Sequence, residues 1–275
     1  MNFVEKTHVR STVRPFYPDI FWLAGAALMA GLAPFTFAAL MIDTRLLDGA
    51  NVWTKPLKFQ VSFAIHFATL AVISARLSET WRRGWLLSAL VPLSLISLFA
   101  EVGYMMLQAA RQEVSHFNVS TSFHAFMYYG VMATGAVLIV AASAGVGWAA
   151  WRDREAALGP ATRLGVVVGL IGGSVLTLIF AGFMSQNLSH QFGNPADPSM
   201  ALPITGWSSE TGDLRTSHFF ATHAMQVLPL FGMLLDRLWR RSSARLLVIS
   251  AGAIWFALSV AIFVQALAGR PFLAL

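Results

Sequence analysis

The sequence predicts an all-α polytopic membrane protein, folded as a bundle of seven transmembrane helices. Hydrophobic residues make up 56% of the 275 residues and charged residues only 12%, which is about half the charged share of a typical soluble domain. The apolar residues form runs long enough to cross a hydrocarbon core of about 30 Å as helices. Because no stretch has the composition of a soluble domain, residues 1–275 are expected to form a single transmembrane domain.

Seven apolar runs define the expected helices. The first run follows a polar, proline-containing segment that lacks a clean cleavage site, so it is expected to be a span and not a removed signal peptide. The second starts at Pro56, because proline is favoured at the first position of a helix, and the third ends before Arg111. In chain order the runs cover about 20–41, 56–75, 84–110, 120–148, 161–185, 217–235 and 244–268.

The later helices carry two further signals. Gly165, Gly169 and Gly173 recur at four-residue spacing in the fifth helix, and such a ridge of small residues lets membrane helices approach closely. The connection 186–216 between the fifth and sixth helices is the longest in the chain. Connections of this length are uncommon unless they act as lids or binding loops, so we expect it to cover a site.

The basic residues predict the orientation of the bundle. Most of them fall in the N-terminal segment and in the connections near 76–83, 152–163 and 236–245, and cytoplasmic connections are enriched in lysine and arginine. We therefore expect a cytoplasmic N-terminus, an outward C-terminus and a working face on the outer side. Because the basic residues are scattered between apolar runs, membrane topology accounts for the net charge of +6, and nucleic acid is not an expected partner.

Polar residues inside the expected helices predict a site. The stretch 206–229 reads GWSSETGDLRTSHFFATHAMQVLP, and ionisable groups within membrane spans are costly and usually functional. Counting inward from rim residues at about 1.5 Å per residue puts four ionisable groups from four helices roughly 12 to 16 Å below the outer rim. They are His66, Glu101, His124 and His223, and we expect them to form one layer that faces the bundle interior.

Such a layer suits a metal or haem. Three imidazoles and a carboxylate could hold a mononuclear Fe, Zn or Cu ion, or two of the histidines could ligate haem b. Thiolate ligands are excluded because the chain has no cysteine. Glu101, His218 and Arg215 are then candidate catalytic groups of a redox enzyme or electron-transfer component acting on a quinone or another lipophilic molecule. The rim cations that would bind haem propionates or another cofactor anion are Lys55, Lys58, Arg111 and Arg215.

Two other functions fit the same residues. Glu101 and the three histidines could form a proton relay in a metal-free protein that binds, senses or transports a small molecule. The inner halves of the helices are nearly free of charge, which disfavours transport. Alternatively, the chain could be a structural or assembly subunit of a larger membrane complex or a homo-oligomer, with membrane lipid as its immediate partner.

Four segments resemble an uncharacterised family of bacterial multipass membrane proteins. They are NVWTKPLKF at 51–59, QAARQEVSHFN at 108–118, PITGWSSETGDLRTSHFFATHAMQVLP at 203–229 and QALAGRPFL at 265–273. The family pattern is WxKPxKF together with GWSxxxGDLRxxHFxxxHAxQxLP. The resemblance implies a multipass protein of the bacterial inner membrane, and it implies no particular activity. In that membrane, the outward functional face expected from the basic residues would be the periplasmic face.

Overall fold

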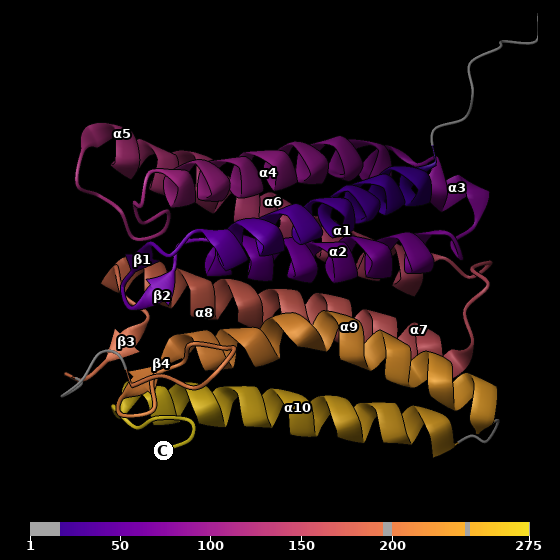
Figure 1. Cartoon of the computed structure of the whole chain (residues 1–275). Coiled ribbons are helices and arrows are strands. Elements are labelled where there is room, and N and C mark those ends of the chain that lie inside the picture. Colours follow the sequence, from indigo (N-terminus) through magenta and orange to yellow (C-terminus); the bar gives the residue numbers. More distant parts are fainter. Residues whose placement is uncertain (1–16, 195–199, 240–242, 275) are drawn as a thin grey trace, which may run out of the picture.

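The chain folds as a helical bundle, described here by a computed structural model for residues 17–194, 200–239 and 243–274. Among these residues, seven helices are long and apolar enough to cross a membrane, as Figure 1 shows. This confirms the predicted fold class and the seven spans. The spans are α1 (Pro18–Ile42), α2 (Thr54–Ser74), α4 (Trp85–Ala110), α5–η1–α6 (Ser122–Ala125, Phe126–Met132, Ala133–Arg152), α7–η2–α8 (Pro160–Val167, Val168–Gly172, Gly173–Asn187), α9 (Leu214–Leu238) and α10 (Ser243–Leu267).

The remaining elements are short. Helix α3 (Glu79–Arg82) joins α2 to α4, and η1 and η2 are π-helical turns within the fourth and fifth spans. Strands β1 (Leu46–Leu47) and β2 (Ala50–Asn51) form one antiparallel pair, and β3 (Gln191–Phe192) and β4 (Gly212–Asp213) form another. Helix α2 begins at Thr54, two residues before the predicted start at Pro56. Of the prolines in the long connection, Pro195 and Pro198 lie outside the described residues.

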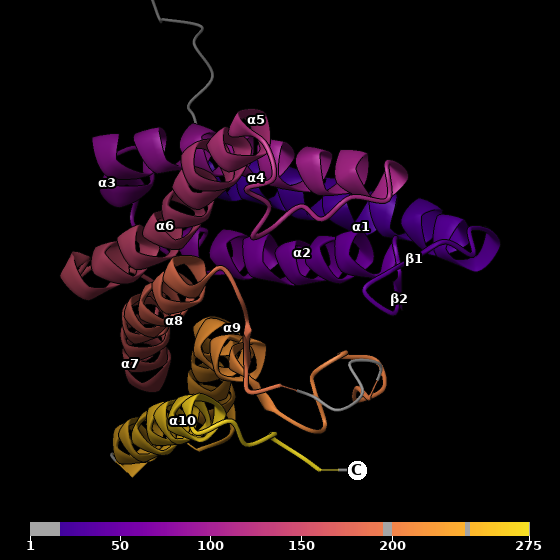
Figure 2. The same ribbon diagram turned by 90° about the vertical axis from the view of Figure 1, so that its left-hand side faces the viewer.

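The spans form two neighbouring groups (Figures 1 and 2). One group contains α1, α2, α4 and α6, and the other contains α7, α8, α9 and α10, with α9 packed against the other three. Helix α9 also contacts α2, and α6 contacts η2, so the groups are joined through the centre. The four strands lie at one end of the bundle, which we call the loop face; its described segments are 43–53, 111–121, 188–194, 200–213 and 268–274.

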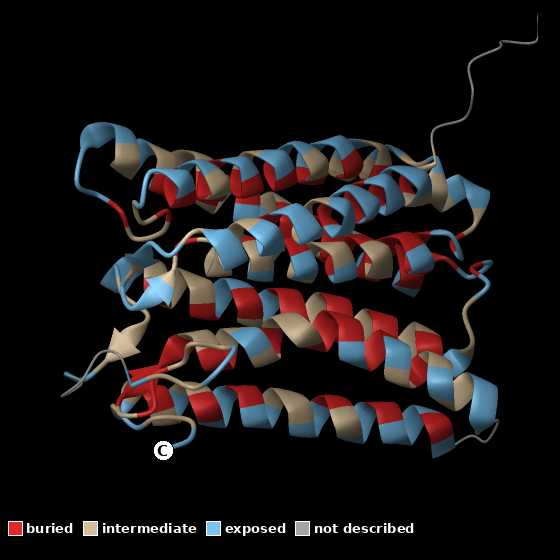
Figure 3. Cartoon of the chain, viewed as in Figure 1, coloured by how far each residue is buried: buried red, intermediate tan, exposed pale blue. Residues whose placement is uncertain are grey.

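Buried side chains line the helix faces that are turned toward one another (Figure 3). Trp22, Phe67 and Leu98 are fully buried where α1, α2 and α4 meet. The Trp22 indole keeps a hydrogen-bond partner there, because its Nε1 donates to Ser94 Oγ at 3.0 Å. Apolar side chains on the outside of the bundle remain exposed, as expected for surfaces that face lipid.

The predicted glycine ridge lies against α9. A Cβ atom at Gly169 would be 2.7 Å from the Ala224 carbonyl oxygen, and one at Gly173 would be 3.1 Å from the Ala221 carbonyl oxygen. Gly165 meets the backbone of Leu228 still more closely. The prediction of a close helix contact is therefore confirmed, and its partner is the helix that carries the polar stretch.

The end opposite the loop face is fastened by carboxylates that bind backbone N–H groups. Asp236 accepts hydrogen bonds from Ala161 N at 3.1 Å and from Thr162 N at 2.7 Å, both in the first turn of α7. Asp153 accepts one from Ser78 N at 2.6 Å. Because the first amides of a helix have no partner within the helix, Asp236 caps α7 from a different span.

Candidate functional site

His66 joins three helices in the middle of the bundle. Its Nδ1 accepts a hydrogen bond from Gln226 Nε2 of α9 at 3.0 Å, and its Nε2 lies 3.0 Å from Ser143 Oγ of α6. Since Nδ1 is the acceptor, the ring proton is assigned to Nε2, which donates to the serine. Both nitrogens are engaged, so in this arrangement His66 has no free lone pair for a metal ion.

Glu101 lies at a different depth from His66, so the prediction of a single layer is wrong. The Glu101 carboxylate packs against Gly135 of α6, where a Cβ atom would be 3.1 Å from Oε1. Ser143, the partner of His66, is eight residues further along the same helix, a rise of roughly 12 Å. Glu101 is therefore about two helical turns nearer the loop face than His66.

His124 belongs to the rim of the loop face. It lies in α5, in the first turn of the fourth span, and its Nε2 is 3.3 Å from Glu113 Oε2. Its Nδ1 is 3.0 Å from Ser120 Oγ, and Arg111 binds the same glutamate at 3.0 Å. The predicted depth failed because it was counted as helical rise from His116, whereas residues 111–121 form a loop.

The third predicted ligand, His223, is close enough to His66 to act on it electrostatically, but its own hydrogen bond lies within α9. Its Nδ1 donates to the carbonyl oxygen of Phe219 at 2.8 Å, and its ring stacks on the Phe219 ring with centroids 3.8 Å apart. Among the described residues, no group of three or more histidine, aspartate or glutamate side chains is placed to hold a metal ion. The arrangement therefore gives no support to the predicted metal or haem site.

A different set of groups converges around Lys55, in the first turn of α2. The Lys55 ammonium is half-buried and has no hydrogen bond or ion pair within the described part of the chain. The charged groups that act on it are Arg215, Glu101, Lys58 and Asp48. Two of these four are cations and two are carboxyl groups, one of which, Glu101, is buried.

Glu101, which acts on Lys55, and Tyr104, which is acted on by Glu113 and Arg111 of the loop face, carry buried oxygen atoms without hydrogen-bond partners among the described residues. Glu101 is 4% exposed, and within the described part of the chain neither its Oε1 nor the Tyr104 hydroxyl has a hydrogen-bond partner. The two residues share a face of α4, since three positions differ by about 60° around a helix. Buried polar atoms are normally paired, so these two oxygen atoms indicate a place where a ligand or proton is received.

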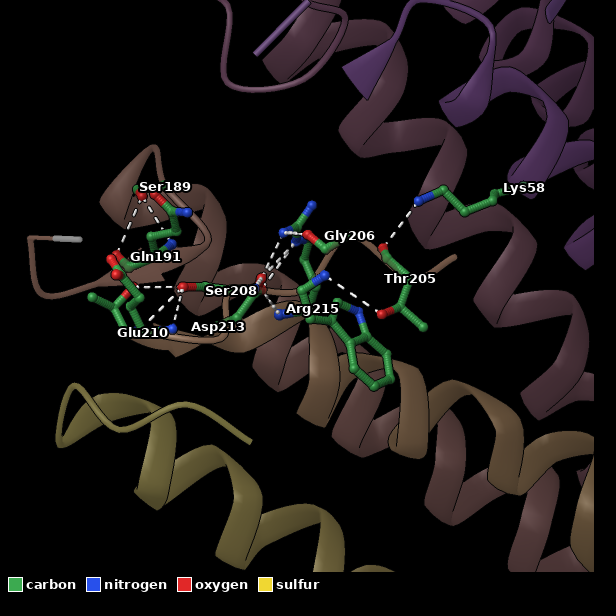
Figure 4. Close-up of polar contacts among 11 residues, drawn as sticks. Lys58, Ser189, Gln191, Thr205, Gly206, Ser208, Glu210, Asp213 and Arg215 are labelled. Atoms are coloured by element: carbon green, nitrogen blue, oxygen red, sulfur yellow. Dashed lines mark hydrogen bonds and ion pairs between the residues drawn. The ribbon is translucent and has the colours of Figure 1, made fainter. Parts of the chain in front are cut away.

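Arg215 and Lys58 hold the long connection over the site (Figure 4). The Arg215 guanidinium binds the Asp213 carboxylate, with Nε 2.9 Å from Oδ1 and Nη2 2.5 Å from Oδ2. Its Nη2 also donates to the Gly206 carbonyl oxygen at 2.6 Å, and Lys58 Nζ donates to the Thr205 carbonyl oxygen at 3.0 Å. The predicted lid segment thus contacts the site through two adjacent carbonyl groups.

Buried imidazole rings lie beside the cations of the site. Burial, together with the positive charges of Lys55 and His218, holds the pKa of His116 well below its usual range. Burial and the nearby Arg215 lower the pKa of His190 to about 4. Both rings are therefore neutral at pH 7 and offer one donor and one acceptor each. His218 acts on His116 and presents a buried Nδ1 with no partner.

Aromatic rings that sequence reasoning missed form a wall beside these imidazoles. Phe117 lies 5.6 Å from Tyr128 and 6.1 Å from His190 between ring centroids, and Phe59 lies 5.7 Å from His116. Phe59 could have been found from periodicity, because it is seven residues before His66 and so shares its helix face. The loop contacts of Phe117 had no such signal.

The polar site is distinct from an apolar groove of about 720 Å³ between α8 and α10, which Val175, Leu176 and Phe256 line. A groove lined in this way carries no chemistry of its own, so the function is argued from the polar site. In the predicted site set, Lys55, Lys58, Glu101, Arg215 and His218 belong to that site. Comparison with protein-family models, with curated proteins and with solved structures finds no match to this chain.

Proposed function

We propose that the protein binds a small organic anion at the loop face, as a metal-free binding or sensing protein of the bacterial inner membrane. Lys55, Lys58 and Arg215 receive the anion, and Glu101 exchanges a proton with it. The orientation predicted from the basic residues directs this site to the periplasm. The unpartnered Lys55 ammonium carries the proposal, because an unpaired charge in a partly buried position is stabilised when an anion binds.

Three further features support an anion. Two cations act on Lys55 and repel its charge, and one of them, Lys58, is bound to a carbonyl oxygen and not to a carboxylate, whereas Arg215 is paired with Asp213. The neutral rings of His116 and His190 supply hydrogen-bond donors at the same place. The aromatic wall excludes water from one side, which strengthens electrostatic attraction within the site.

The test is a thermal unfolding measurement on detergent-purified protein. The probe is lactate, and its neutral amide analogue, lactamide, is the control ligand. Lactate is expected to raise the unfolding temperature in a concentration-dependent manner, and lactamide is not. Lys55→Gln should weaken lactate binding by roughly tenfold or more, because hydrogen bonds to charged groups contribute about 1.5–3 kcal/mol.

Arg83→Gln is the matched control, since Arg83 is a cation at the opposite end of the bundle. This variant should keep the lactate response. Inorganic phosphate serves as a second anion of different shape. If neither anion raises the unfolding temperature, or if lactamide acts as well as lactate, the anion site is refuted.

A further inference from the structure

The distribution of lysine sets the two site lysines apart. Lysine occurs only at positions 6, 55 and 58, and every other basic residue of the chain is arginine. Apart from Lys6 in the N-terminal segment, the other positive charges at the rim and at the opposite end belong to arginines. Arginine remains protonated in proteins, whereas a lysine amine can lose its proton and act as a nucleophile.

The surroundings of Lys55 are those of a reactive amine. Within the described residues, Lys55 Nζ has no carboxylate or carbonyl oxygen as a hydrogen-bond partner, whereas Lys58 Nζ donates to the Thr205 carbonyl oxygen. Arg215 and Lys58 act on Lys55 as cations, and Glu101 and Asp48 act on it as carboxyl groups; an adjacent cationic group activates a lysine as a nucleophile. Glu101, an electrostatic neighbour of Lys55, has a buried Oε1 that is free to take or return a proton.

We propose that Lys55 forms an imine with the carbonyl group of a 2-oxo acid bound at this site. The inference rests on the proposed function, because the carboxylate of the same molecule is held by Lys58 and Arg215. Lys55 and Lys58 are three residues apart on α2, so their stems leave the same side of the helix about 5–6 Å apart. A carboxylate and a carbonyl on adjacent carbon atoms match two neighbouring nitrogen groups.

The step balances within the site, and it begins when the Lys55 ammonium passes one proton to the Glu101 carboxylate to become a neutral amine. The Lys55 amine nitrogen attacks the carbonyl carbon, a C–N bond forms, and the carbonyl oxygen takes a proton to give a carbinolamine. Loss of that oxygen as water, with the second amine proton, leaves the C=N bond. Glu101 accepts a proton from the nitrogen and returns it to the departing oxygen, so no oxidant or reductant is consumed.

The experiment uses pyruvate as the probe and sodium cyanoborohydride to reduce any imine to a stable amine, on the full chain in detergent at pH 7. Peptide mapping by mass spectrometry then locates the adduct. We expect it at Lys55, with Lys6 and Lys58 as internal comparisons on the same chain. Lactate, which has a hydroxyl group in place of the ketone of pyruvate, should suppress the adduct by competition, and Lys55→Arg should abolish it.

The outcomes separate this inference from the proposed function. If lactate raises the unfolding temperature but pyruvate leaves no adduct at Lys55, the anion site stands and the imine is refuted. An adduct shared equally among Lys6, Lys55 and Lys58, or one that lactate does not suppress, also refutes it. If lactate has no effect and no adduct forms, both proposals fail.

Discussion

The hydrogen bonds of His66 lead to a quantitative prediction about stability. His66 is 6% exposed, and Ser143→Ala removes the acceptor of its Nε2 proton. An unsatisfied buried group costs about 1–3 kcal/mol in soluble proteins, whereas interhelical hydrogen bonds in membrane proteins average about 0.6 and reach about 1.7 kcal/mol. We expect Ser143→Ala to lower the free energy of unfolding by about 1 kcal/mol, and Gln226→Leu to do the same through Nδ1.

A double-mutant cycle isolates this contact. If His66 and Ser143 interact directly, the double variant His66→Leu/Ser143→Ala should be less destabilised than the sum of the single variants, by roughly 0.5–1.5 kcal/mol. The assay is reversible unfolding by sodium dodecyl sulfate in mixed micelles. Ser259→Ala is the control, because Ser259 is fully buried but bonds only within its own helix, to the Trp255 carbonyl oxygen at 2.8 Å. A coupling of zero for Ser143, equal to that for Ser259, would refute the interhelical role of His66.

Three further predictions concern the loop face and the helix contacts. Burial lowers the pKa of folded His190 to about 4, below its value in the unfolded chain. The unfolded chain therefore binds more protons as the pH falls from about 6.5 toward 4, and the protein loses stability across that window. His190→Phe should make the unfolding temperature less dependent on pH there, and an unchanged dependence would contradict this. Asp236→Ala should lower the free energy of unfolding by about 1–2 kcal/mol, as expected for loss of a helix cap. Backbone hydrogen exchange should then become faster in the first turn of α7, and unchanged exchange there would contradict the capping role. Gly169→Val should lower the free energy of unfolding by about 1–3 kcal/mol through overpacking against α9, as measured by the same unfolding titration. Gly182→Ala should be nearly neutral, because a Cβ atom at Gly182 meets no heavy atom within 4 Å. Equal effects of the two variants would argue against the close contact.

The site could be predicted in part because polar groups are rare in this chain. Lys55, Glu101, Arg215 and His218 were found simply as ionisable residues in or next to apolar runs, where a polar group needs a physical reason. The prediction of their partners was less successful. The sequence grouped Glu101 with His66, His124 and His223, whereas in the structure it lies near Lys55 and against Gly135.

Depth and orientation explain the difference. Counting at a fixed rise is valid only within one continuous helix, so it failed for His124, which was counted from His116 across the loop 111–121. Helix periodicity gives the angle of a side chain about its own axis, but not the helix that it faces. Gln226 lies in the polar stretch 206–229, and only the packing of α9 against α2 shows that it binds His66.

The sequence by itself determined the class, the seven spans and the glycine ridge, because each depends on local composition or on spacing within one helix. Only the tertiary structure decided which polar residues meet, since those contacts join segments far apart in the chain, such as Lys58 with Thr205 and Arg215 with Gly206. The distribution of hydrogen bonds then separated His66, whose two nitrogens are satisfied, from Lys55, whose ammonium is not. Whether a side chain has hydrogen-bond partners depends on other segments of the chain, so no local sequence pattern encodes it. For this reason the sequence predicted a metal bound by histidines, whereas the structure supports the proposal of an anion bound at Lys55.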